Sequence, residues 1–144
     1  MSTPYASAIT IVQAIWSAGW TGESAPVLWH QNTADATPNA ATTTHWLHLA
    51  VEFERERTIA FGGGRRARER ELEGTVSIRS LAKRNMGESE LLRLLDKAVG
   101  VFRGEHSAPL SFIGDAVLTQ PGASADGIWW VRSAIAGFVY RFQG

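Results

Sequence analysis

The sequence predicts an α+β fold, in which an antiparallel or mixed β-sheet with a long β-hairpin carries two α-helices on one face. Three observations predict it: an apolar stripe of helical period in the first 20 residues, alternating apolar and polar residues on both sides of a glycine triplet at 62–64, and a second helical stripe after residue 85. A chain of 144 residues buries enough surface for one ordinary core. We therefore expect a single domain, 1–144.

The first helix is predicted from its start signals. Ser2 or Thr3 can cap it and Pro4 suits its first position, and the apolar stripe that follows consists of Ile9, Val12, Ile15 and Trp16. Thr21 and Gly22 end it. A short strand is expected from Val27 to His30, and the small polar residues of 31–44 predict a surface loop.

The centre of the chain predicts a hairpin. From His45 the period is two, with Leu47, Leu49, Val51 and Phe53 on one face. The alternation returns after the glycines, where Leu72, Val76 and Ile78 oppose Glu71, Glu73, Ser77 and Arg79. The two runs are therefore expected to be the arms of one hairpin, with the glycines at its tip.

A second helix and two strands complete the prediction. Asn85 with Glu88 forms a variant of the capping box, and the helix that follows is expected to end at Gly104. One strand is expected from Leu110, and another over 128–142, where both faces are apolar and cover is expected on both sides. Since only two helices are predicted, one face of the sheet needs curling or a partner to cover it.

Composition excludes several classes of site and partner. There is no cysteine, which excludes disulfides, thiolate metal sites and cysteine nucleophiles. Fourteen basic and fourteen acidic residues cancel, so no overall field favours nucleic acid or a membrane. The first residues lack the basic start of a signal peptide, and no apolar run reaches the ~20 residues of a membrane span. We expect a soluble, untargeted chain.

No pattern predicts catalysis, a cofactor or a metal. His45 and His48 are three apart on a strand, so they point to opposite faces and cannot chelate one ion. The serines match no nucleophile elbow, and the paired carboxylates are strand-surface glutamates. A small ligand-binding or enzyme dimer with a pocket at Trp129, Trp130 and His48 stays open as an alternative.

The segment from Glu52 to Glu73 is the most unusual feature, with six arginines and six glutamates around Gly62, Gly63 and Gly64. The phosphate-loop pattern is absent, and the glutamates beside the arginines weaken any field for nucleic acid. A flexible, solvated hairpin tip is the simplest interpretation. The alternative is subunit contact, because mixed charges fix register and reject wrong partners. Trp46, on the polar side of its strand, is a further candidate interface anchor.

The segment from Trp46 to Val99, WLHLAVEFERERTIAFGGGRRARERELEGTVSIRSLAKRNMGESELLRLLDKAV, resembles the tail-terminator-like minor tail proteins of long-tailed phages and gene-transfer agents. The resemblance implies a structural protein with no enzymatic activity. Six subunits would close a ring on the head-proximal end of the tail tube, halt polymerisation and join the tail to the capsid connector. It further implies assembly in the host bacterial cytoplasm into the particle's tail, without a membrane.

In that interpretation the partners are other copies of the chain, the tail tube protein, and a neck, connector or head-completion protein. The expected subunit interface comprises Trp46, Glu52, Glu54, Arg55, Glu56, Arg57, Glu69, Glu71 and Glu73. The expected loop that faces the lumen or a partner, with transient and non-specific DNA contact at most, comprises Gly62, Gly63, Gly64, Arg65, Arg66, Arg68 and Arg70. Another neck, tail-completion or head-tail joining protein would follow the same ring logic.

Overall fold

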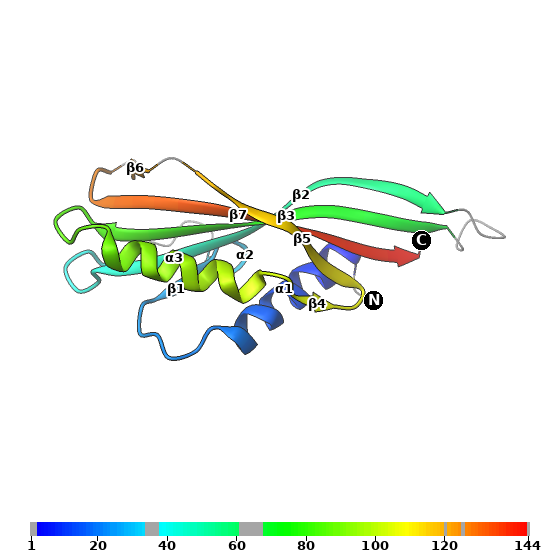
Figure 1. Cartoon of the computed structure of the whole chain (residues 1–144), viewed down its shortest axis with the longest axis horizontal. Helices are drawn as coiled ribbons and strands as arrows, with labels where there is room; N and C mark the ends of the chain where they lie inside the picture. The colour runs from blue at the N-terminus through cyan, green and yellow to red at the C-terminus, as the bar shows by residue number, and fades with distance from the viewer. Residues whose placement is uncertain (1–2, 34–37, 61–67, 120, 125, 144) are drawn as a thin grey trace.

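A computed structural model describes residues 3–33, 38–60, 68–119, 121–124 and 126–143 of the chain (Figure 1). Among these residues three helices and a mixed sheet of seven strands form the α+β fold, and the sheet order is β1-β2-β3-β7-β5-β4 with β6 beside β7. The elements are α1 Pro4–Gly19, β1 Val27–Trp29, α2 His30–Thr33, β2 His45–Ala60, β3 Glu69–Lys83, α3 Ser89–Phe102, β4 His106–Ser107, β5 Leu110–Leu118, β6 Gly122–Ala123 and β7 Trp129–Gln143.

The first helix, α1, begins as its sequence predicts. Oγ1 of Thr3 accepts a hydrogen bond from the backbone N–H of Ala6 at 3.2 Å, and Pro4 occupies the first turn. The helix ends at Gly19, just before the expected stop at Thr21 and Gly22. Its start signals and its apolar stripe are both local, which is why the sequence suffices to locate it.

Two features near residue 30 differ from the prediction. β1 pairs with β2 in parallel, and the start of the expected loop forms the short helix α2. Within α2, the side-chain amide of Gln31 donates to the carbonyl of Val51 at 2.8 Å and accepts from the N–H of Val51 at 3.2 Å. Gln31 thus takes the place of a strand neighbour and satisfies the edge of β2 just beyond β1.

The predicted hairpin is confirmed, with β2 and β3 antiparallel along most of their length. The pairing shifts between Phe53, opposite Gly74, and Arg55, opposite Glu73. Because this bulge adds one residue to β2, side chains beyond it change face. Phe53 and Arg55 therefore lie on opposite faces of the sheet.

The helix α3 begins later than predicted. Its N-cap is Glu88, whose side chain makes no capping hydrogen bond, so the prediction of Asn85 as the cap is wrong. Its first turn is joined to the sheet, since the hydroxyl of Ser80 in β3 donates to the carbonyl of Leu91 at 2.9 Å in the interior. The helix ends at Phe102, and Gly104 follows with a φ of 71°.

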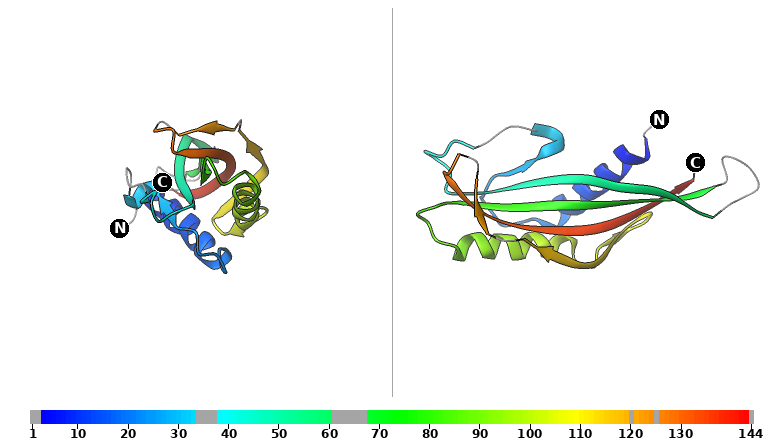
Figure 2. Two further views of the ribbon diagram at one scale, coloured as in Figure 1. Left: turned by 90° about the vertical axis from the view of Figure 1, so that its left-hand side faces the viewer. Right: turned by 90° about the horizontal axis from the view of Figure 1, so that it is seen from above.

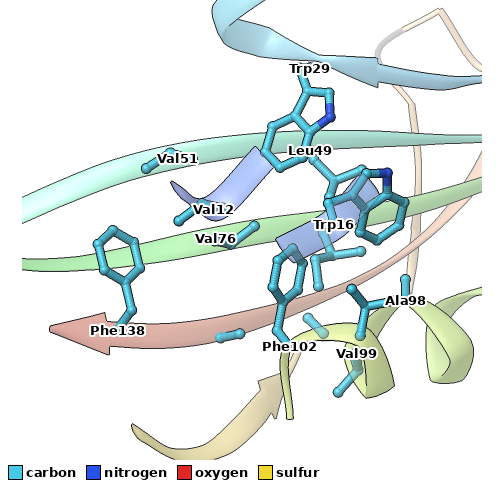
Figure 3. Close-up of a cluster of buried hydrophobic side chains, with 14 of the residues drawn as sticks. Val12, Trp16, Trp29, Leu49, Val51, Val76, Ala98, Val99, Phe102 and Phe138 are labelled. Atoms are coloured by element: carbon cyan, nitrogen blue, oxygen red, sulfur yellow. The ribbon is translucent and has the colours of Figure 1, made fainter. Parts of the chain in front are cut away.

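The main core lies between the sheet and the two long helices, on one face as predicted (Figure 3). Trp16 of α1 stacks on Phe102 of α3 with ring centroids 5.7 Å apart, and Phe102 contacts Phe112 of β5 at 4.8 Å. Phe138 of β7 extends the aromatic contacts toward the hairpin. This packing joins elements from both ends of the chain.

Among the described residues, the other face of the sheet has a buried apolar cluster at one end only. Trp46, Leu81, Trp129 and Val131 form a second, smaller cluster, which Leu28 and Ala40 flank. Farther along β7, Ile135 is exposed, so the expectation of cover on both sides of this strand is wrong in its central part. Seen along its long axis, the sheet is curled (Figure 2).

A charged contact joins the segment after α1 to α3. Oε1 of Glu23 lies 2.7 Å from Nη1 of Arg93 and 3.1 Å from Nζ of Lys97, and hydrogen bonds from these two cations lower the pKa of Glu23 from 4.5 to about 2. A lowered pKa contributes stability above the ordinary value of 4.5, and that contribution is lost as pH falls toward 2.

We therefore expect Glu23→Gln to melt below the wild type at pH 7, and the gap to close between about pH 4.5 and 2. Thermal denaturation followed by circular dichroism across this range measures the gap. Glu105→Gln, at an exposed position, is the control and is expected to match the wild type throughout. A gap that stays constant with pH would contradict the contact.

Candidate interaction surface

A ladder of paired charges lies on the open face of the hairpin, beyond the bulge in β2. Nε of Arg55 is 2.7 Å from Oε2 of Glu73, and Nη2 of Arg57 is 2.8 Å from Oε1 of Glu71. Arg141 of β7 adds a third strand to the ladder, with its Nε 3.3 Å from Oε2 of Glu71. Hydrogen bonding to Arg55 also lowers the pKa of Glu73.

Glu71 is the centre of this ladder. Its side chain is 6% exposed and lies between the guanidinium groups of Arg57 and Arg141, which come from the two neighbouring strands. A carboxylate buried to this degree needs such partners, since an unpaired buried charge is strongly unfavourable. The ladder therefore stiffens the hairpin within one subunit.

The helix-facing side of the hairpin carries a second charged group. Nη1 of Arg70 is 2.7 Å from Oε1 of Glu56, and the hydroxyl of Tyr5 in α1 donates to Oε2 of Glu56 at 2.9 Å. Both hydrogen bonds lower the pKa of Glu56, and the bond from Arg70 has the larger effect. This contact ties the start of α1 to the hairpin.

The remaining predicted site residues are dispersed. Glu52 and Glu54 are exposed, and Glu69 pairs with Ala60 where the described part of the hairpin ends. Trp46 is 5% exposed and packs against Trp129 in its own subunit, with ring centroids 5.9 Å apart. Arg68 is half-buried just before β3, while the rest of the predicted loop lies outside the described residues, namely Gly62, Gly63, Gly64, Arg65 and Arg66.

A surface that the sequence did not single out surrounds β5. Nine large apolar side chains are exposed among the described residues, and five of them lie on or beside β5. Ile113, Val117 and Ile135 lie on the face of the sheet away from α3, and Leu92 and Leu118 lie on the α3 side. Val117 pairs directly with Ile135 across β5 and β7. We call these five residues the β5-edge surface.

The edge itself is open. β4 pairs only with Leu110 and Ser111, so the rest of β5 has no strand on its outer side among the described residues. Pairing with β7 is interrupted between Ile113 and Val117, where Gly114 adopts a φ of 69°. The dipeptide Gly114-Asp115 inside an apolar run was the available sequence signal of such an irregular edge strand.

A groove of about 410 Å³ adjoins this surface between α3 and the strands β5 and β7. Its lining residues are Leu92, Leu95, Asp96, Val99, Arg103, Ala116, Leu118, Thr119, Arg132 and Ser133. Nε of Arg132 is buried and finds no acceptor among the described residues. The groove is therefore lined by apolar side chains of α3 and β5 together with polar ones, among them the guanidinium groups of Arg103, just after α3, and Arg132 of β7.

The alternative pocket at Trp129, Trp130 and His48 is not formed by the described residues. Trp129 is 1% exposed, and Trp130 lies on the opposite face of β7, where its Nε1 donates to Oε1 of Glu88 at 2.7 Å. The two tryptophans thus do not share a pocket with His48, whose pKa is lowered by burial. Among the described residues no three histidine or acidic side chains gather as metal ligands, and none of the described helices has the length and apolarity to span a membrane.

Comparison with known proteins identifies a fold and no family. No family model and no curated protein matches the chain. A solved structure that bears only a sequence identifier, without a functional name, covers 93% of this chain and 96% of its own, with a TM-score of 0.61 and 16% identity. At this identity the similarity shows a shared fold alone, an α+β architecture with a mixed sheet.

Proposed function

We propose that this protein is a structural, ring-forming subunit of a phage-like particle, a tail terminator of the kind that its central segment resembles. The observation that carries the proposal is the β5-edge surface, where apolar side chains are exposed on and beside an edge strand of the sheet. An exposed apolar edge of this kind promotes aggregation unless another protein covers it. The surface therefore favours association.

The opposite edge of the sheet, formed by β1 and β2, is more polar than the edge at β5. There β2 carries charged side chains in its second half, and Gln31 satisfies its edge at Val51. Two unlike sides favour a head-to-tail contact, in which one side of a subunit meets the other side of the next. Repeated contacts of this type close into a ring when the rotation between subunits allows it.

In the proposed particle six copies form the ring at the head-proximal end of the tail tube. The ring stops polymerisation of the tube protein and presents the surface for a neck, connector or head-completion protein. DNA would touch the lumen transiently and without sequence preference. Assembly in the host bacterial cytoplasm follows from this role.

The test uses purified protein with and without tail tubes. We expect wild-type subunits to form rings, or to bind tube ends and stop their growth, as seen by mass photometry and negative-stain imaging. Val117→Lys places a charge on the β5-edge surface and is expected to weaken association at least about tenfold, or about 1.4 kcal/mol. Its melting temperature should stay near that of the wild type, because Val117 is 63% exposed.

Ile128→Lys is the matched control, since Ile128 is also exposed but lies outside the β5-edge surface. It is expected to assemble normally. A compact dimer that ignores tubes would overturn the proposed function, and a ring that binds a neck component but no tube would indicate a different joining protein. Unchanged assembly of Val117→Lys would show that the contact lies elsewhere.

A further inference from the structure

The groove beside the β5-edge surface has the shape of a receptor for an elongated segment. Its wall along α3 is a single stripe of Leu92, Leu95 and Val99, continued by Arg103 just after the helix, and it spans about 16 Å at 1.5 Å per residue. Ala116 and Leu118 of β5 face this stripe across the groove. A wall of three helical turns suits a strand or hairpin better than a small, compact molecule.

The charges in the groove have no partner among the described residues, in contrast to those of the hairpin. Asp96, Arg103 and Arg132 make no hydrogen bond or ion pair through their side chains with any other described residue. Most guanidinium groups of the hairpin, by comparison, are matched to carboxylates within the subunit. For Nε of the half-buried Arg132 in particular, the described part of the chain holds no acceptor, and an incoming group could supply one.

A segment with matching properties lies elsewhere in the same chain. The described end of the hairpin, 54–60 of β2 with 69–73 of β3, is called the arm here. Ile59 is its exposed large apolar residue, and Glu69, opposite Ala60, makes no hydrogen bond or ion pair with a described residue. The arm thus offers an apolar side chain and a carboxylate close together.

We propose that the groove receives the arm of a second copy of this chain, with Ile59 against its apolar wall and Glu69 toward Arg103 and Arg132. The arm projects at one end of the molecule, whereas α3 begins at the other (Figure 1), so a subunit cannot fill its own groove. The contact is head-to-tail, and it rests on the proposed ring function.

The absence of cysteine from the chain allows a direct test by engineered disulfides. Ile59→Cys protein is mixed with Leu92→Cys protein over a range of concentrations, with and without tail tubes, and then oxidised. We expect a linked heterodimer in at least fivefold excess over the control mixture, which pairs Ile59→Cys with Ile128→Cys. Both partner positions are similarly exposed, so the difference reports docking.

A charge exchange tests the polar half of the contact. Glu69→Arg or Arg103→Glu, added to the cysteine chains, is expected to reduce the yield of linked dimer, and the two together are expected to restore it. Yields equal to the control, or equal reductions in single and combined variants, would overturn the arm-in-groove contact. Rings on tube ends together with control-level linking would overturn this contact and leave the proposed function standing.

Discussion

Gly74→Ala is expected to destabilise the protein by about 1–3 kcal/mol, the usual cost of overpacking. A Cβ atom at this position would lie 2.5 Å from Cζ of Phe138 and 2.8 Å from the backbone oxygen of Glu52. The oxygen belongs to a paired strand, and Phe138 is 1% exposed and in contact with Phe53 and Phe112. Neither neighbour can retreat without opening the sheet or the core.

Urea denaturation measures this cost, and Gly100→Ala is the matched control. Gly100 lies inside α3, and a Cβ there meets nothing within 4 Å. Because alanine favours helix over glycine, the control is expected to gain about 0.5–1 kcal/mol. A Gly74→Ala protein as stable as the wild type would contradict the close approach of β2, β3 and Phe138.

Phe102→Ala is expected to cost about 3–5 kcal/mol, the range for removal of a buried aromatic ring. Phe102 is 1% exposed, and its ring stacks between Trp16 of α1 and Phe112 of β5. Its loss would leave a cavity where both long helices and the sheet meet. No single neighbour can refill that space, because each belongs to a different element.

Equilibrium denaturation of Phe102→Ala should be compared with that of Leu92→Ala. Leu92 lies on the same helix but is 39% exposed, so its truncation is expected to change the free energy of unfolding by less than about 1 kcal/mol. Similar losses for the two variants would mean that α3 packs on the sheet through a different face. The same Leu92→Ala protein also supplies a folded variant with an altered groove.

The long hairpin and the two long helices could be predicted because each signal is local. Alternation of period two over Leu47 to Phe53 and a stripe of helical period from Leu91 to Phe102 need only near neighbours to be interpreted. The parallel pairing of β1 could not be predicted in this way. The three residues of β1 carry no pattern that distinguishes parallel from antiparallel pairing, which is decided by its contact with β2.

In the candidate site, too, the sequence predicts some features and tertiary contacts decide others. The sequence identifies the charged residues of the hairpin, but the bulge after Phe53 decides that Arg55 and Arg57 meet Glu73 and Glu71 within the subunit. Similarly, Trp46 on a polar strand face resembles an exposed anchor, yet the curled sheet brings Trp129 against it. The bulge after Phe53 and the contact of Trp129 with Trp46 both depend on tertiary structure, so the local sequence pattern does not record them.

By itself, then, the sequence determined the two long helices, the long strands, the faces of β2 up to Phe53 and the residues that carry charge, because these depend on periods within a few residues. Only the tertiary structure decided which charges are already paired, which apolar residues remain exposed at β5, and that Nε of Arg132 is buried at a groove with no acceptor among the described residues. The physical reason is that exposure and pairing depend on strand order and register. Those are set by contacts between residues 9 to 74 positions apart, most of which no local pattern records.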